Sequence, residues 1–280
     1  MTRRDLLPAV AAPFAAPLLS NAAPLPELPG RLNQSVTRGV FGRGVSLEQA
    51  CQQCAKLGIK GFDLIGVPDW PLLKKYGMIP TMVPGAMQLT DGTNDKSLHP
   101  AIELLFRKLI PLAAEAAAPN VIALSGNRRG KSDQEGLDNT VAILNKVKAL
   151  AEDKGVTICL ELLNSKVNHP DYQCDHTSWG VEVCKRVNSP RVKLLFDIYH
   201  MQIMEGDIVR TIRNNIQYIG HFHTAGNPGR HEMDDSQEMN YRGIARAIAD
   251  LNYKGWVGHE YSPTKDPLES LQATLKMFEV

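Results

Sequence analysis

The chain has 280 residues, of which 43% are hydrophobic and 22% are charged. Its 31 basic and 30 acidic residues give a formal net charge of +1, which excludes electrostatic capture of nucleic acid or an anionic membrane as the main driving force. Five irregularly spaced cysteines are too few for a disulfide framework. The length fits one barrel of about 250 residues, although two average domains are also compatible with it.

Residues 1–23 have the layout of an export signal. Arg3 and Arg4 precede an apolar run at residues 8–19, and small residues follow at 20–23. This order predicts a twin-arginine signal peptide and a periplasmic or exported protein; without it the chain is expected to be cytoplasmic. Three prolines interrupt the apolar run, so a loosely docked arm is the alternative. No other segment approaches the roughly 18 apolar residues of a membrane span, so no membrane partner is expected.

After a Pro-rich spacer at residues 24–31, short apolar runs alternate with stretches of helical periodicity. Strands are predicted at residues 32–37, 61–65, 79–83, 121–125, 156–162, 192–196, 218–222 and 256–260. Helices are predicted at residues 46–57, 70–76, 97–117, 133–154, 177–187, 207–214, 241–251 and 267–278. Eight such units favour a single α/β domain at residues 32–280, a (β/α)8 TIM barrel, over an open doubly wound sheet.

The last four predicted strands each end in an ionisable residue: Glu161, Asp197, His223 and Glu260. Barrel enzymes carry their chemistry at these strand ends, and neighbouring strands lie about 4.8 Å apart, so the four side chains can converge on one divalent ion. An oxygen-rich set without thiolates favours Mn²⁺, Mg²⁺ or Co²⁺, with Zn²⁺ also possible. Any one of these acids could be a structural group. Together they are harder to explain without a metal, because each unpaired buried carboxylate destabilises the folded state by on the order of several kcal/mol.

This metal site suits proton transfer next to a carbonyl. A divalent ion on the carbonyl and hydroxyl oxygens of a substrate stabilises the ene-diolate that forms when the α proton leaves. Glu161 and Glu260 face each other across the barrel mouth, where one can remove the proton and the other can return it. Return to the adjacent carbon is isomerisation, and return to the opposite face of the same carbon is epimerisation. His200 can polarise a substrate oxygen, and Arg230 can hold a carboxylate or two hydroxyls.

Four segments of the chain resemble the hydroxypyruvate isomerase branch of the xylose isomerase-like barrel superfamily. They are residues 160–164 (LELLN), 196–207 (FDIYHMQIMEGD), 226–232 (GNPGRHE) and 255–261 (GWVGHEY). The resemblance implies that Glu161, Asp197, His223 and Glu260 bind one divalent metal. It also implies that Glu161 and Glu260 form the acid/base pair and that His200 and Arg230 hold substrate oxygens.

The chain departs from this branch in two places. His223 stands where hydroxypyruvate isomerases typically have Gln and ketose 3-epimerases have His. The loop at residues 233–238 lacks the usual glycine pattern, and in or beside it Glu232 and Glu238 could reach the substrate.

The expected function is that of a metal-dependent isomerase of small hydroxy-aldehydes and hydroxy-ketones, with a small-molecule substrate, no nucleic acid partner and a homo-oligomer as a further possibility. A ketose 3-epimerase, or a lyase or dehydratase acting through the same enolate, would use the same residues. A phosphodiesterase like endonuclease IV would need more His ligands and a basic DNA face. A non-catalytic sugar-binding barrel would be expected to lack Glu161 or Glu260, and both are present.

Overall fold

The computed structural model describes residues 26–85 and 87–280. The predicted export signal lies outside the described residues, and the predicted spacer is described only from residue 26. Within the described ranges, no helix is both long enough and apolar enough to cross a bilayer.

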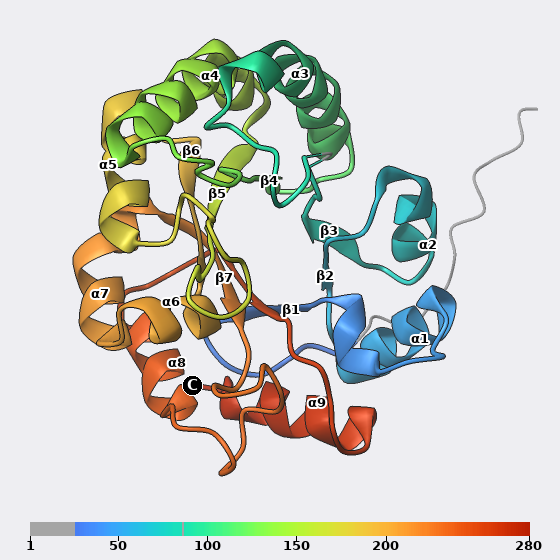
Figure 1. Cartoon of the computed structure of the whole chain (residues 1–280). Coiled ribbons are helices and arrows are strands. Elements are labelled where there is room, and N and C mark those ends of the chain that lie inside the picture. Colours follow the sequence, from blue (N-terminus) through green and yellow to red (C-terminus); the bar gives the residue numbers. More distant parts are fainter. Residues whose placement is uncertain (1–25, 86) are drawn as a thin grey trace, which may run out of the picture.

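The eight predicted strands are present and parallel, and each observed end lies within two residues of its predicted position (Figure 1). They are β1 (Asn33–Val36), β2 (Gly61–Asp63), β3 (Ile79–Met82), β4 (Asn120–Ala123), β5 (Thr157–Leu162), β6 (Val192–Asp197), β7 (Ile219–Thr224) and β8 (Trp256–His259). The strand order β3-β2-β1-β8-β7-β6-β5-β4 places β1 beside β8. One parallel bridge from Val83 to Val121 joins the remaining edges next to β3 and β4. The fold is therefore the predicted (β/α)8 barrel.

Helices surround the strands (Figure 1). The eight predicted ones are α1 (Leu47–Leu57), α2 (Trp70–Lys75), α3 (His99–Glu115), α4 (Asp133–Lys154), α5 (Thr177–Val187), α7 (Ile208–Asn215), α8 (Tyr241–Asp250) and α9 (Pro267–Met277). Local signals set their ends. Ser46 forms a capping box with Gln49 at the start of α1, and Gly58 ends that helix in the left-handed conformation. Cys51 and Cys54 lie inside α1 and are buried.

Among the described residues, one α-helix was not predicted. Helix α6 (Ile198–Met204) begins immediately after β6, and five of its seven residues are buried. Such a short segment, buried on most sides, has no amphipathic period to reveal it. Asp197 caps it, because the Asp197 carboxylate accepts hydrogen bonds from the backbone N–H groups of Tyr199 (2.9 Å) and His200 (3.3 Å). The helix therefore holds His200 one turn above the end of β6.

Candidate metal centre and active site

The four predicted metal ligands converge at the barrel mouth. Each offers one ligand atom, and these atoms all lie within 4.8 Å of one another. Strand register explains the convergence, because Asp197 and His223 are paired across β6 and β7. Glu161 lies near the end of β5, and Glu260 follows β8, where its backbone N–H bonds to Thr224 O at 2.9 Å.

The polar atoms that face this cluster are not satisfied by protein. His223 Nδ1 lies 2.9 Å from Glu260 Oε2 and 3.8 Å from Glu161 Oε1, and Arg230 Nη2 lies 2.8 Å from Glu260 Oε2. Across the described part of the chain, His223 Nδ1 and Glu260 Oε2 are nevertheless among the few buried side-chain atoms without a hydrogen bond of acceptable geometry. Buried polar atoms are normally paired, so these two mark a place where another group is expected.

The charges at the site are also unbalanced. Burial raises the pKa of Glu161 and of Asp197, and the nearby charge of Glu260 adds to the shift of both. Burial acts in the same direction on Glu260, but His223 and Arg230 outweigh it and hold the pKa of Glu260 at about 2. The two buried carboxylates of Glu161 and Asp197 and the partly exposed carboxylate of Glu260 thus face one guanidinium, Arg230, and one imidazole, His223. Three oxygen donors, one imidazole nitrogen and an excess of negative charge fit a divalent ion.

Helix α6 places His200 beside this cluster, and the ring is fully buried. Asn164 Oδ1 accepts the backbone N–H groups of Val167 (3.0 Å) and Asn168 (2.8 Å), which identifies the other amide atom as the nitrogen. That nitrogen lies 2.6 Å from His200 Nδ1, so Nδ1 accepts and the proton of the neutral ring is on Nε2. His200 Nε2 lies 3.6 Å from Asp197 Oδ2 and has no hydrogen-bond partner among the described residues. His200 therefore offers a free N–H donor at the site, as its predicted role requires.

Arg230 reaches the cluster from the loop between β7 and α8. Its Nη2 is 3.6 Å from Asp197 Oδ2, and its guanidinium lies 5.7 Å from the centre of the Tyr199 ring. The backbone of Arg230 has φ +60°, a left-handed conformation that non-glycine residues adopt only when their surroundings hold them. Two backbone hydrogen bonds do so, from Arg230 N to Gly226 O and from Ser262 N to Arg230 O, each 2.9 Å.

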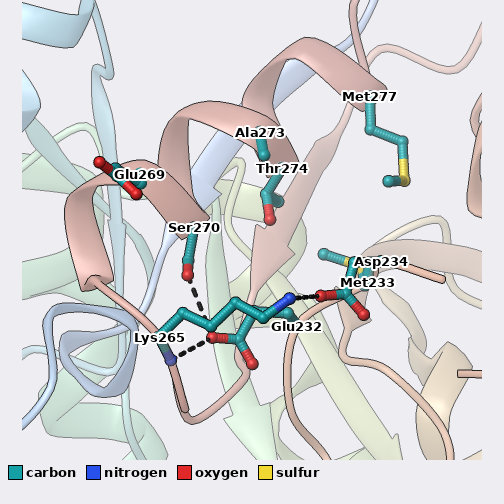
Figure 2. Close-up of a pocket in the computed structure, with 9 residues that line it drawn as sticks. All are labelled: Glu232, Met233, Asp234, Lys265, Glu269, Ser270, Ala273, Thr274 and Met277. Atoms are coloured by element: carbon teal, nitrogen blue, oxygen red, sulfur yellow. Dashed lines mark hydrogen bonds and ion pairs between the residues drawn. The ribbon is translucent and has the colours of Figure 1, made fainter. Parts of the chain in front are cut away.

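The two additional glutamates of this loop lie outside the four-residue cluster. Glu232 lines a hollow of about 260 Å³ next to α9. Figure 2 shows its carboxylate pointing to Ser270 on that helix and to Lys265 before it. Its carboxylate accepts hydrogen bonds from the backbone N–H groups of Thr264 (2.7 Å) and Lys265 (3.0 Å) and from Ser270 Oγ (3.0 Å). Glu238 accepts from the Asn227 amide at 2.6 Å. The buried Glu232 thus ties the loop that carries Arg230 to the segment before α9, whereas Glu238 is exposed.

One charged residue of the barrel interior was not predicted as functional. Asp63, the last residue of β2, is completely buried and contacts both His221 and His223. Its only sequence signal is an acid at the end of a short apolar strand, and many surface residues share that signal.

Comparison with known proteins agrees with the fold and with the predicted resemblance. The profile described as xylose isomerase-like TIM barrel matches residues 51–279. The 2-oxo-tetronate isomerase of Cupriavidus necator is 39% identical over 113 residues, 40% of this chain and 43% of that protein. The hydroxypyruvate isomerase of Escherichia coli K12 is 36% identical over 105 residues, 36% of this chain and 40% of that protein. The chain thus matches less than half the length of these curated relatives.

Solved structures extend the likeness to nearly the whole fold. A family 2 AP endonuclease from Brucella melitensis superposes with a TM-score of 0.79 and 23% identity, covering 88% of this chain and 99% of that one. A D-psicose 3-epimerase from Clostridium cellulolyticum H10 gives a TM-score of 0.71 and 18% identity, covering 89% of this chain and all of that one. At these identities the likeness concerns the fold alone. Because the profile match covers most of the sequence, the chain belongs to the xylose isomerase-like TIM barrel family.

Proposed function

We propose that the protein is a divalent-metal-dependent isomerase that interconverts small hydroxy-aldehydes and hydroxy-ketones. The observation that carries this proposal is the cluster of Glu161, Asp197, His223 and Glu260, whose ligand atoms lie within 4.8 Å of one another. When bound there, a divalent ion would supply a positive charge that stabilises an ene-diolate. The names of the curated relatives, both isomerases of small oxo compounds, support the same reaction class.

The chain's own residues have distinct parts in this reaction. Glu161 and Glu260 reach the cluster from β5 and from the end of β8, so a substrate between them has a carboxyl group on each side. One carboxylate takes the proton from the carbon next to the carbonyl, and a carboxylic acid returns a proton to the adjacent carbon. A second proton passes from the substrate hydroxyl to the former carbonyl oxygen, which completes the isomerisation without an oxidant or reductant.

His200 and Arg230 orient the substrate in this proposal. The free Nε2–H of His200 can donate to a substrate oxygen. Arg230 already binds two carboxylates of the site and has a planar pair of donors suited to a carboxylate or to two hydroxyls. A small hydroxy-carbonyl acid, with a carboxylate at one end, matches these two donors and is the substrate class we favour.

The reaction is tested by solvent deuterium incorporation, followed by NMR, with hydroxypyruvate, tartronate semialdehyde, 2-oxo-tetronate, free ketoses and inosose. We expect Glu161→Gln and Glu260→Gln each to lower turnover by about 10²-fold to 10⁴-fold while the fold persists. Glu115→Gln is the matched control, because Glu115 is an exposed residue at the end of α3 and does not belong to the cluster. Full activity of either active-site variant would exclude the acid/base assignment.

The same experiment separates isomerase from epimerase. A ketose 3-epimerase is the second candidate, because His223 is the residue that ketose 3-epimerases have at this position. Deuterium at an inverted carbon of a free ketose would identify an epimerase, whereas deuterium at the carbon beside the original centre would identify an isomerase. Loss of water or cleavage of the substrate would instead identify the dehydratase or lyase alternative.

Metal identity, location and assembly are part of the proposal. We expect about one Mn²⁺, Mg²⁺, Co²⁺ or Zn²⁺ per chain by elemental analysis. N-terminal sequencing of protein from the native source is expected to begin near Ala22 or Ala23 if the export signal is used. Light scattering measures whether the chain forms a homo-oligomer.

A further inference from the structure

The barrel interior below the metal cluster contains a second set of polar groups, centred on Asp63. Asp63 Oδ2 lies 2.8 Å from His221 Nε2, 3.2 Å from His223 Nε2 and 3.1 Å from Ser35 Oγ. The Thr81 hydroxyl donates to Asp63 Oδ1. All five side chains are fully buried. We propose that Asp63 is a positioning residue that makes His223 a ligand through Nδ1, an inference that rests on the metal-dependent function proposed above.

The hydrogen bonds define where the protons lie. The Asn120 amide donates to Thr81 O (3.0 Å) and approaches His221 Nδ1 at 3.4 Å, so His221 accepts at Nδ1 and donates to Asp63 through Nε2. A carboxylate can only accept, so His223 also donates to Asp63 from Nε2. The remaining nitrogen of His223, Nδ1, then faces Glu161 and Glu260 with its lone pair available to an ion.

Asp63, His221 and His223 are themselves close enough to hold an ion. Their facing atoms, however, already make hydrogen bonds with one another. His223 Nδ1, on the other side of the ring, has no such partner among the described residues. The observations therefore favour one ion bound at Nδ1 of His223, with Asp63 hydrogen-bonded to Nε2 on the opposite side of the same ring.

Strand β8 leaves room for the contacts of Asp63 with the two histidines, because it has a glycine at position 258. A Cβ atom on Gly258 would lie 2.0 Å from Asp63 Oδ2 and 2.9 Å from His223 Cδ2. Both distances are too short for any side chain, so Asp63 can contact the two imidazoles only because residue 258 is glycine. Asp63, from β2, thus reaches across the interior to histidines of β7.

A carboxylate behind a metal-bound histidine fixes the tautomer and the orientation of the ring and makes the ligand more basic. Asp63→Asn has nearly the same shape but no negative charge. Even with its amide oxygen towards both imidazoles, it no longer makes His223 a more basic ligand. We expect Asp63→Asn to weaken Mn²⁺ binding by about 10-fold to 100-fold. Free Mn²⁺ measured by electron paramagnetic resonance gives this affinity without any activity assay.

The matched control is Thr81→Val, which removes one hydrogen bond to Asp63 but leaves both imidazole bonds. We expect its Mn²⁺ affinity to stay within about 3-fold of wild type, even if its stability falls. A double-mutant cycle with His223→Ala completes the test. If Asp63 acts through His223, Asp63→Asn causes no further loss of affinity in the His223→Ala background.

If Asp63→Asn does not fold, NMR of the wild-type protein decides the question. With ¹⁵N-labelled histidine and bound diamagnetic Mg²⁺, we expect His223 to carry its proton on Nε2 and none on Nδ1. A proton on Nδ1, or equal Mn²⁺ affinities of wild type and Asp63→Asn, would overturn this inference alone. Failure of the wild-type protein to bind any divalent ion would instead overturn the metal-dependent function on which it rests.

Discussion

Asp197→Asn provides a direct test of the charge balance at the candidate metal centre. With His223 neutral, three carboxylates and Arg230 leave two negative charges, which one divalent ion neutralises. An ion present at about 100 times its Kd stabilises the folded state by about 2.7 kcal/mol. For roughly 250 ordered residues the unfolding entropy is about 0.5 kcal/mol per degree, so the Tm of the wild-type protein should rise by about 5 °C.

Asp197→Asn removes one ligand charge but keeps the helix cap, because Asn and Asp cap helices about equally well. We therefore expect the metal-free variant to melt within about 2 °C of the metal-free wild type, or above it, since a buried charge is lost. The rise in Tm that Mn²⁺ causes in the wild-type protein should largely disappear in Asp197→Asn. Differential scanning calorimetry of chelator-treated protein, with and without Mn²⁺, measures both quantities.

Asp266→Asn is the matched control. Asp266 caps α9 with the same geometry, accepting from the backbone N–H groups of Leu268 (3.0 Å) and Glu269 (2.9 Å). It should keep the full rise in Tm with Mn²⁺. An unchanged rise in Asp197→Asn, or its loss in Asp266→Asn, would refute the assignment of the stabilisation to the four-residue cluster.

Three further predictions concern the same site. Burial raises the pKa of Glu161, and the surrounding carboxylates, against the cost of burial, raise that of His223. Ionising Glu161 above pH 4.5 and deprotonating His223 at higher pH both destabilise the folded state. Burial lowers the pKa of His200 to about 2 and that of His259 to about 3, which has the opposite effect on stability up to about pH 7. The Tm of metal-free protein should therefore fall from about pH 7.5 to 9, and a flat profile over that range would contradict this. Asn164→Asp should lower kcat/KM at least about 10-fold, or about 1.4 kcal/mol, because an aspartate here accepts from His200 Nδ1 and so moves the ring proton from Nε2 to Nδ1. A folded circular dichroism spectrum at the assay temperature is the control. Glu232→Gln should lower the free energy of unfolding by about 1–3 kcal/mol, measured in urea, and no change would exclude its role in holding the loop.

The barrel could be predicted because its signals are local. Each strand is a short apolar run, each outer helix has one apolar face, and caps such as Ser46 and Gly58 lie within a turn of the helix ends. Helix α6 escaped prediction because it is short and mostly buried, so its residues lack an alternation of polar and apolar faces. Its one local signal is Asp197, whose place at a strand end predicts a metal ligand and whose Oδ1 also caps the helix.

The four clustered side chains could be predicted for a topological reason. In a parallel barrel all strands end at the same rim. Side chains at the ends of successive strands therefore lie close together, independently of the conformation of the connecting loops. His200 and Arg230 depend on more than this rule, because one lies on the unpredicted helix and the other on a loop with a left-handed backbone. Their hydrogen-bond partners, Asn164 and Ser262, belong to other βα units and have no sequence pattern that links them.

Asp63 could not have been found in this way. It is separated from Thr81 by 18 residues, from Ser35 by 28, and from His221 and His223 by 158 and 160. Only the closed barrel brings these groups together, and only a glycine on β8 leaves room for them. A pattern of strand ends can therefore identify which histidine faces an ion, but the nitrogen that binds it depends on the group behind the ring. In this chain that group is a carboxylate on the far side of the barrel, so the chemistry of His223 is decided by tertiary structure.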